Sequence, residues 1–168
     1  MRTIRGIAWA AGVVMAVACG SDSTAPPAGD NELACVNPAT AGAAVTCSVK
    51  LPAKATIKVV LTSHETCEAH GDLFATTAPL PPDTLTVDGC FDTIGKEIDL
   101  GPFDAGATVS AEIKPGLLFG GASGRAAVQV TGQYPTWTVR MEDALDAFAG
   151  QPNDYDDVVV TVTAVPTT

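Results

Sequence analysis

The sequence predicts an all-β protein, an antiparallel β-sandwich of about seven to nine strands. Three observations support this class. Apolar and polar residues alternate in several short runs rich in Val, Ile and Thr, the pattern of strands with one buried and one solvated face. Clusters of Gly and Pro separate these runs, as expected for turns. No stretch forms a long amphipathic helix that could connect parallel strands, so an antiparallel arrangement follows.

Each predicted strand rests on its own alternation of side chains. In the first stripe Val45, Cys47 and Val49 alternate with Thr46, Ser48 and Lys50. In the second, Ile57, Val59 and Leu61 alternate with Thr56, Lys58 and Thr62. The later stripes lie at residues 85–87, 109–113, 128–130, 137–141 and 158–162.

Turn signals and one weak helical signal complete this assignment. Only Glu142–Ala149 could form one or two helical turns, with Leu145 and Phe148 on one side. The turns are predicted at Pro79–Asp83, Gly101–Pro102, Pro115–Gly116, Gly120–Gly124 and Gly132–Pro135.

The first eighteen residues predict an export signal. Arg2 and Arg5 give a short positive region, and Ile7–Ala18 is apolar and uncharged. The segment is shorter than the roughly 20 residues that span hydrocarbon, which indicates a secretion signal and not a membrane span. Its removal takes away two of the nine basic residues and none of the nineteen acidic ones, so the formal charge changes from −10 to −12.

The signal ends in Ala16-Val17-Ala18-Cys19, which resembles the lipobox of bacterial lipoproteins. The resemblance implies cleavage before Cys19, a diacylglycerol on its sulfur and an acyl chain on the new amino terminus. Several acyl chains make such an anchor effectively permanent. Gly20, where some lipoproteins carry Asp, implies the outer membrane in a cell that has one. The alternative is an ordinary secretory signal cut after the same small residues.

Three segments follow from this assignment: a signal peptide at 1–18, a tether at 19–31 that begins with lipidated Cys19, and a β-sandwich domain at 32–168. The tether is rich in Ser, Pro, Gly and Ala and contains no large apolar side chain. Gly20–Asp30, as a flexible coil, would reach about 17–20 Å. The acidic charge of the chain argues against a nucleic-acid partner, and the lipid anchor makes the membrane its first partner.

The cysteines are consistent with an oxidising compartment. Lipidation uses Cys19, and the other four form an even set that predicts two disulfides. Three pairings are open; we favour Cys35–Cys47 and Cys67–Cys90 because each joins sequence neighbours. Cys67 also lies midway between His64 and His70, a spacing seen in metal sites, but a disulfide is its more ordinary use in an exported protein.

An acidic segment near the carboxyl terminus is the candidate binding site. No Lys or Arg separates its six carboxylates, and the strands predicted on either side should bring its ends together. Calcium suits such a loop because it takes six to eight oxygen ligands in flexible geometry. The Asp-x-Asp spacing at residues 154 and 156 would place both carboxylates on one side of an extended chain. We expect calcium ligands among Glu142, Asp143, Asp154, Asp156 and Asp157, with Asp146 less certain; the alternative is a solvated loop that keeps the protein soluble.

The stretch from Trp137 to Val162 also resembles the closing motif of the DUF4114-like domains of secreted bacterial proteins. That resemblance implies a β-rich fold and a calcium-binding acidic loop. By position, Glu142 and Asp143 match the Glu-Asp step of the motif. Its second cluster matches Asp154, Tyr155 and Asp157, with Asp156 in place of Asn, whereas Met141 stands where Phe is usual.

No catalytic constellation is recognisable, because the chain lacks a Gly-x-Ser-x-Gly elbow and a phosphate-binding loop with its Lys, and we expect no enzyme. Two functions remain. In the first, the protein would be a membrane-anchored binding or adhesion module for an extracellular carbohydrate or protein ligand, with calcium fixing one end of the sandwich. Alternatively, it is a structural or accessory envelope lipoprotein that recruits a protein partner and holds no metal.

Overall fold

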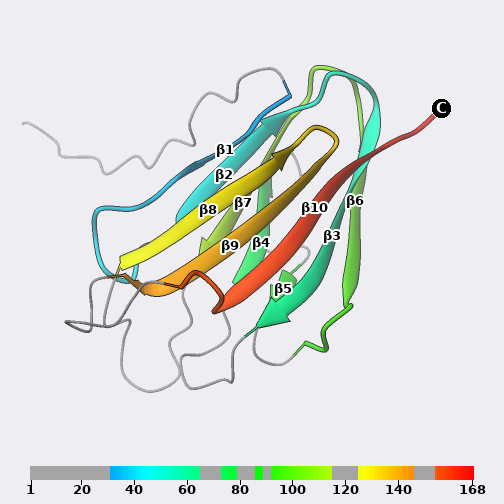
Figure 1. Cartoon of the computed structure of the whole chain (residues 1–168). Coiled ribbons are helices and arrows are strands. Elements are labelled where there is room, and N and C mark those ends of the chain that lie inside the picture. Colours follow the sequence, from blue (N-terminus) through cyan, green and yellow to red (C-terminus); the bar gives the residue numbers. More distant parts are fainter. Residues whose placement is uncertain (1–30, 65–72, 79–85, 89–91, 115–124, 146–153) are drawn as a thin grey trace, which may run out of the picture.

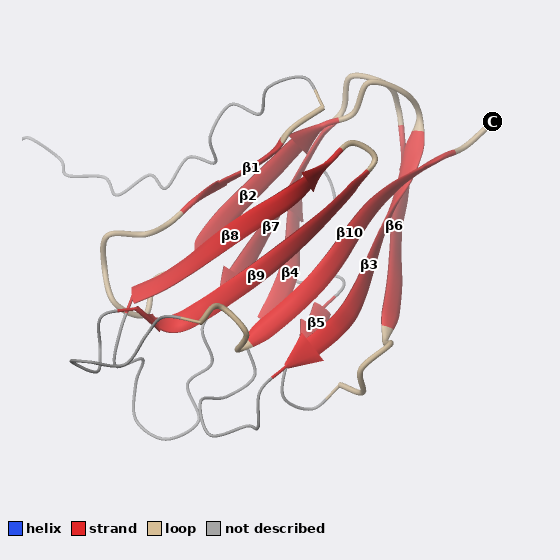
Figure 2. Cartoon of the chain, viewed as in Figure 1, coloured by secondary structure: helices blue, strands red, loops and turns tan. Residues whose placement is uncertain are grey.

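The computed structural model of the chain describes residues 31–64, 73–78, 86–88, 92–114, 125–145 and 154–168. These ranges contain ten β-strands and no helix (Figure 2). In chain order the strands are β1 (Leu33–Val36), β2 (Val45–Lys50), β3 (Ala55–His64), β4 (Leu73–Ala78), β5 (Thr86–Asp88), β6 (Glu97–Phe103), β7 (Thr108–Lys114), β8 (Arg125–Gln133), β9 (Thr136–Leu145) and β10 (Val158–Pro166).

The strands form two five-stranded sheets that pack face to face (Figure 1). The first sheet has the order β1-β2-β7-β4-β5 and the second β6-β3-β10-β9-β8. Every recorded strand pair is antiparallel. This arrangement confirms the predicted antiparallel β-sandwich, and the described strands include three that alternation did not reveal.

The core lies between the sheets and follows the predicted alternation on β3, whereas on β2 Thr46 and Ser48, which were expected to be solvated, are buried as well. On β3, Ile57, Val59 and Leu61 are buried, whereas the residues between them are partly exposed. The facing strand β2 contributes Val45 and Val49 to the same cluster. Burial of one such side chain contributes about 1.5–3 kcal/mol, so these apolar stripes are the main source of stability.

Strand β6 is one of the elements that the sequence did not predict. Ile98, Leu100 and Phe103 face the core, and Ile98 and Leu100 alternate with the exposed Glu97 and Asp99. The alternating run is short and is followed by a Gly-Pro step, which in a sequence indicates a turn. The turn predicted at Gly101–Pro102 is wrong, since both residues lie within β6. Leu100 pairs with Ile57 and Phe103 with Ala55, so the strand gains an extra residue in a bulge. Gly101 provides the positive φ of 112° that this bend requires.

The helical turns considered for Glu142–Ala149 are also wrong for the described part of that segment, because Glu142–Leu145 continue β9. Ladder pairing explains the difference: Glu142 lies opposite Ala127 and Leu145 opposite Arg125 of β8. Residues 146–149 lie outside the described ranges.

The two ends of the sandwich differ, and we name them by their residues. The N-terminal pole holds the start of β1 and the turns at residues 51–54, 104–107 and 134–135. The acidic pole holds the ends of β3 and β9, the start of β10 and the turn at 92–96. In Figure 1 the N-terminal pole is at the top and the acidic pole at the bottom.

Short turns at the N-terminal pole are hydrogen-bonded to one another. The amide of Gly106 donates to the carbonyl of Leu51 at 2.7 Å, and the amide of Leu51 donates to Ala107 O at 2.9 Å. Thr167 N donates to Lys54 O at 3.1 Å, which fixes the end of the chain to the β2–β3 turn. These bonds satisfy backbone groups that strand pairing leaves unpaired.

Cys35 and Cys47 form a disulfide with an S–S distance of 2.05 Å. They lie directly opposite each other on the paired strands β1 and β2, which confirms the first predicted pairing. The proposed Cys67–Cys90 bond lies outside the described residues. Because β1 has only four residues and lies at the edge of its sheet, the disulfide supplements a short hydrogen-bond ladder.

Strand β1 also lies near β8, where the two sheets meet (Figure 1). Asn37, just after β1, accepts a hydrogen bond through Oδ1 from the amide of Val128 at 2.9 Å. This bond occupies one donor on the outer edge of β8 and joins the sheets at that side, which reduces the edge available for further strand pairing.

Candidate metal site at the acidic pole

Strands β9 and β10 bring the two ends of the acidic segment together. They pair antiparallel, with Met141 opposite Val158. Glu142 follows Met141 and Asp157 precedes Val158, so the two carboxylates occupy neighbouring positions at the strand ends. The predicted convergence of the flanking strands is therefore confirmed.

Glu142 occupies an unexpected environment. Trp137, Val139 and Met141 of β9 face the core, so Glu142 belongs to the outer face of its sheet, where its cross-strand partner is Ala127. Its exposed fraction is nevertheless only 8%. A buried carboxylate is retained only when other groups compensate for the loss of water, and Glu142 does interact with another group.

The second acidic cluster is not extended. Tyr155 has a φ of +56°, a left-handed conformation that costs an ordinary residue about 1–2 kcal/mol. The prediction that Asp154 and Asp156 project from one side of an extended chain is therefore wrong. Their exposure also differs, since Asp154 is exposed whereas Asp156 and Asp157 are half-buried.

The side chains of Asp156 and Asp157 both interact with other groups. One oxygen of Asp156, Oδ1, is closed to solvent and accepts no hydrogen bond within the described structure. The turn at Tyr155 thus places the carboxylates of this cluster in different surroundings instead of forming one solvated row.

In the ranges that the structure describes, no three His, Cys, Asp or Glu side chains form a group able to hold a metal ion. The outcome for the expected ligands is mixed. Glu142, Asp154, Asp156 and Asp157 all lie at the acidic pole. Asp143 is placed by its backbone on β9, and Asp146 lies outside the described residues. Calcium binding stays a prediction.

His64 is a neighbour of this site that the calcium hypothesis did not include. It ends β3 directly opposite Val158 of β10, so β3, β10 and β9 place His64, Asp157 and Glu142 at three adjacent strand ends. The sequence signal was its position at the end of an alternating run. Its metal alternative with Cys67 and His70 cannot be followed further, because those two residues lie outside the described ranges.

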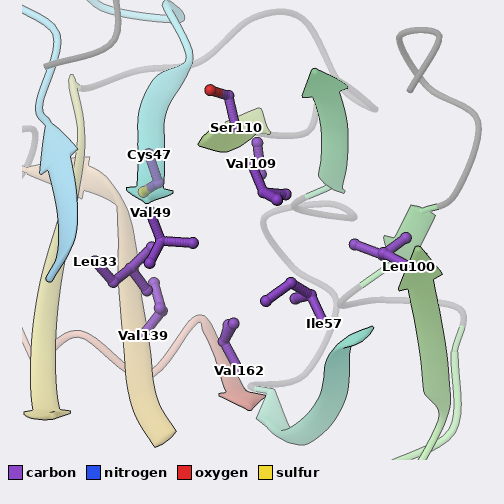
Figure 3. Close-up of a pocket in the computed structure, with 10 residues that line it drawn as sticks. Leu33, Cys47, Val49, Ile57, Leu100, Val109, Ser110, Val139 and Val162 are labelled. Carbon is purple, nitrogen blue, oxygen red and sulfur yellow. The ribbon is translucent and has the colours of Figure 1, made fainter. Parts of the chain in front are cut away.

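A small apolar cavity lies between the sheets (Figure 3). The cavity has a volume of about 20 Å³, which is room for about one water molecule. Val49, Val109 and Leu100 are among its lining residues. Its size and its apolar walls make it a packing defect and not a site for a carbohydrate.

The sequence matches no protein-family model and no curated protein. In the part of the chain that the structure describes, no helix is long and apolar enough to span a membrane.

Proposed function

We propose that the protein is a membrane-anchored exported lipoprotein whose β-sandwich is a binding or adhesion module with a calcium-stabilised acidic loop. Lipidation of Cys19 would hold it in the cell envelope, at the outer membrane where one exists. The observation that carries the binding role is the division of the sandwich into two unlike poles. The N-terminal pole receives the tether through Leu33 and β1, and the opposite pole gathers carboxylates from two strand ends.

Calcium would contribute electrostatic stabilisation at the acidic pole. Glu142 and Asp157 lie at neighbouring strand ends, and Asp154 and Asp156 precede them on the way into β10. Like charges at this density repel one another, and a divalent cation would neutralise them. Oxygen is the only ligand type that these four residues offer, which suits a hard cation.

Thermal unfolding of the mature domain with and without millimolar calcium tests the metal. At a concentration one hundredfold above Kd, a ligand of the native state adds about 2.7 kcal/mol, so the melting temperature should rise by several degrees. Asp154→Asn with Asp157→Asn should abolish the rise. A matched control, Glu32→Gln with Asp104→Asn, removes two exposed charges at the N-terminal pole and should preserve the rise. A wild-type melting curve that ignores calcium would contradict the proposal.

The anchor has a separate test. Expressed from its complete sequence, the wild-type protein should fractionate with membranes and partition into detergent, whereas Cys19→Ser should yield a soluble exported form. Retention of the variant in the membrane fraction would contradict lipid anchoring through Cys19 and would leave the calcium experiment unaffected.

One observation favours the second candidate, an accessory envelope lipoprotein that recruits a protein and holds no metal. The described carboxylates do not come together as a group of three. Carbohydrate and protein arrays probed with and without chelator distinguish the two. Chelator-sensitive capture of a ligand supports the calcium-dependent module, and chelator-insensitive co-purification with an envelope complex supports the accessory role.

A further inference from the structure

We infer that the anchored sandwich stands on its N-terminal pole at the membrane surface and presents the acidic pole outward to its partner. This inference rests on the proposed lipid anchor and adds which surface faces the lipid and which remains accessible. It follows from the position of β1, the length of the strands, the length of the tether and the distribution of charge.

The register places the start of the domain firmly at one pole. Leu33 lies opposite Val49, near the end of β2, and Lys50 lies opposite Thr108 at the start of β7. In Figure 1 the described chain begins at the same end of the sandwich as these residues. The tether therefore emerges from the N-terminal pole.

Strand length sets the distance between the poles. β3 runs from Ala55 at the N-terminal pole to His64 at the acidic pole and contains ten residues. At about 3.3 Å per residue it spans roughly 33 Å. The acidic pole therefore lies roughly 33 Å from the pole at which the tether emerges.

The tether is too short to permit easy inversion. A flexible chain of the length of segment 19–31 has a root-mean-square reach of about 18–22 Å and a maximum length of about 43–47 Å when fully extended. With the acidic pole on the membrane, Asn31 would be held roughly 33 Å above it. The tether would then be stretched to about three quarters of its maximum length and would lose much of its conformational freedom. With the N-terminal pole on the membrane, no such stretching is required.

Charge favours the same orientation on an anionic membrane. At the N-terminal pole the exposed residues Lys50 and Lys54 balance the exposed residues Glu32 and Asp104. The acidic pole carries Glu142 and the cluster at residues 154–157, together with Asp92, which pairs with Lys96, and Arg125 at the start of β8. Its excess of carboxylates would be repelled within about one Debye length, near 8 Å, of an anionic surface.

This orientation defines the partner's approach. The turns of the N-terminal pole face the lipid headgroups, and a partner reaches the acidic pole at least one strand length above the surface. The fitting partner is a macromolecule that approaches from outside the membrane, and not a lipid headgroup of the same bilayer.

Depth-dependent quenching of a fluorophore tests the orientation in the complete lipidated protein. A clickable non-natural residue is introduced at Ala53, which is exposed at the N-terminal pole, or at Ile94, which is 55% exposed at the acidic pole. The protein is reconstituted in vesicles containing phosphatidylglycerol and headgroup-spin-labelled lipid. The label at 53 should be quenched several-fold more strongly than the label at 94. Equal quenching, or stronger quenching at 94, would overturn the inference.

Two controls separate the causes. The Cys19→Ser form should show quenching at neither position. Failure of the protein with an intact Cys19 to bind vesicles would contradict the proposed lipid anchor and not the proposed orientation. Duplication of residues 20–30 relaxes the tether and should reduce the difference between the two labels. A difference that persists unchanged with the longer tether and with Lys50→Glu and Lys54→Glu together would overturn the proposed physical basis.

Discussion

The two poles of the sandwich follow different physical rules. At the N-terminal pole, the turns at 51–54 and 104–107 are hydrogen-bonded to each other, and the turn at 134–135 is hydrogen-bonded to β10. At the acidic pole, the strand ends carry concentrated negative charge, and the sequence between strands is longer. The comparison shows a division of roles. Backbone groups are paired at both poles, since the turn at 92–96 is hydrogen-bonded to β3 as well. What distinguishes the acidic pole is its carboxylates, among them the buried Glu142 and those beside the left-handed Tyr155. Binding residues commonly occupy such less constrained connections on a rigid scaffold.

The largest difference between the poles in the loss of stability on mutation should appear at two glycines with nearly equal φ angles. Gly132 at the N-terminal pole has a φ of +95°, and a Cβ there would lie 2.6 Å from the carbonyl oxygen of Thr136. Gly95 at the acidic pole has a φ of +92°, but a Cβ there would meet nothing within 4 Å. We expect Gly132→Ala to cost about 3 kcal/mol, from clash and strain together.

Gly95→Ala should cost only the backbone strain, about 1–2 kcal/mol. Urea unfolding of both variants measures the difference. Equal losses would show that the N-terminal turn relaxes around a new side chain as easily as the acidic pole does, and the comparison of the poles would lose its structural basis.

Removal of the disulfide next to the tether should give the second-largest loss of stability. Replacement of Cys35 and Cys47 together by Ala opens a loop with a sequence separation of 12 and should cost about 2–3 kcal/mol in the chain-entropy description. Hydrogen exchange should locate the loss in β1, which among the described strands pairs with β2 alone. Val36→Ala, at a position that is 41% exposed on the same strand, is the control. Exchange that increases uniformly over both sheets would contradict a local role.

Filling the cavity between the sheets should give a smaller effect, a gain in stability. Val109 lines it (Figure 3), and Val109→Ile would add one methylene group in a space of about 20 Å³. We expect a gain of up to about 0.8 kcal/mol, the value of one buried methylene. Val165→Ile, at a position that is 38% exposed, should leave stability unchanged. A loss at position 109 would mean that the core cannot accept the extra group without strain.

The smallest effect should come from the outer face midway between the poles. Lys58 Nζ donates a hydrogen bond to Glu97 Oε1 on the neighbouring strand, and this bond raises the pKa of Lys58 above its ordinary value. A raised folded-state pKa contributes stability below the unfolded pKa, and that contribution is lost as the pH rises through the folded pKa.

Stability should therefore decline slightly more in the wild type than in Glu97→Gln as the pH rises above about 10.4, the ordinary pKa of Lys. Because the pair is exposed to solvent and salt, the effect should be close to the limit of detection in thermal unfolding. A large effect would indicate that the flat outer face contributes more to stability than either pole.

Much of the fold was predictable because strand alternation is a local signal. The stripes at Val45–Val49 and Val158–Val162 lie within β2 and β10. The turn predicted at Gly132–Pro135 is found at its second half, residues 134–135, because Gly132 and Gln133 still belong to β8. Strands β1 and β4 were missed, since the first is short and LFATTA has no clear alternation. The bulge in β6 was missed because a Gly-Pro step in a sequence ordinarily indicates a turn.

The candidate site was predictable only in part. Alternating stripes in β9 and β10 were enough to bring Glu142 and Asp157 together once the strands paired. The left-handed backbone at Tyr155 was not predictable, because a non-glycine residue rarely adopts it and no local pattern signals it. The burial of Glu142 was also hidden, since its outward position on β9 would ordinarily be solvated.

The sequence by itself determined which residues could form strands, that the class is an antiparallel sandwich, and that Cys35 could pair with Cys47. These features depend on side-chain periodicity and on separations of a few residues, which are local quantities. Only the tertiary structure decided the order β6-β3-β10-β9-β8, the bulge around Gly101 and the separation of a closely bonded N-terminal pole from an acidic one. Pairing order and burial depend on contacts between residues far apart in the chain, and those contacts arise only when both sheets pack on a common core.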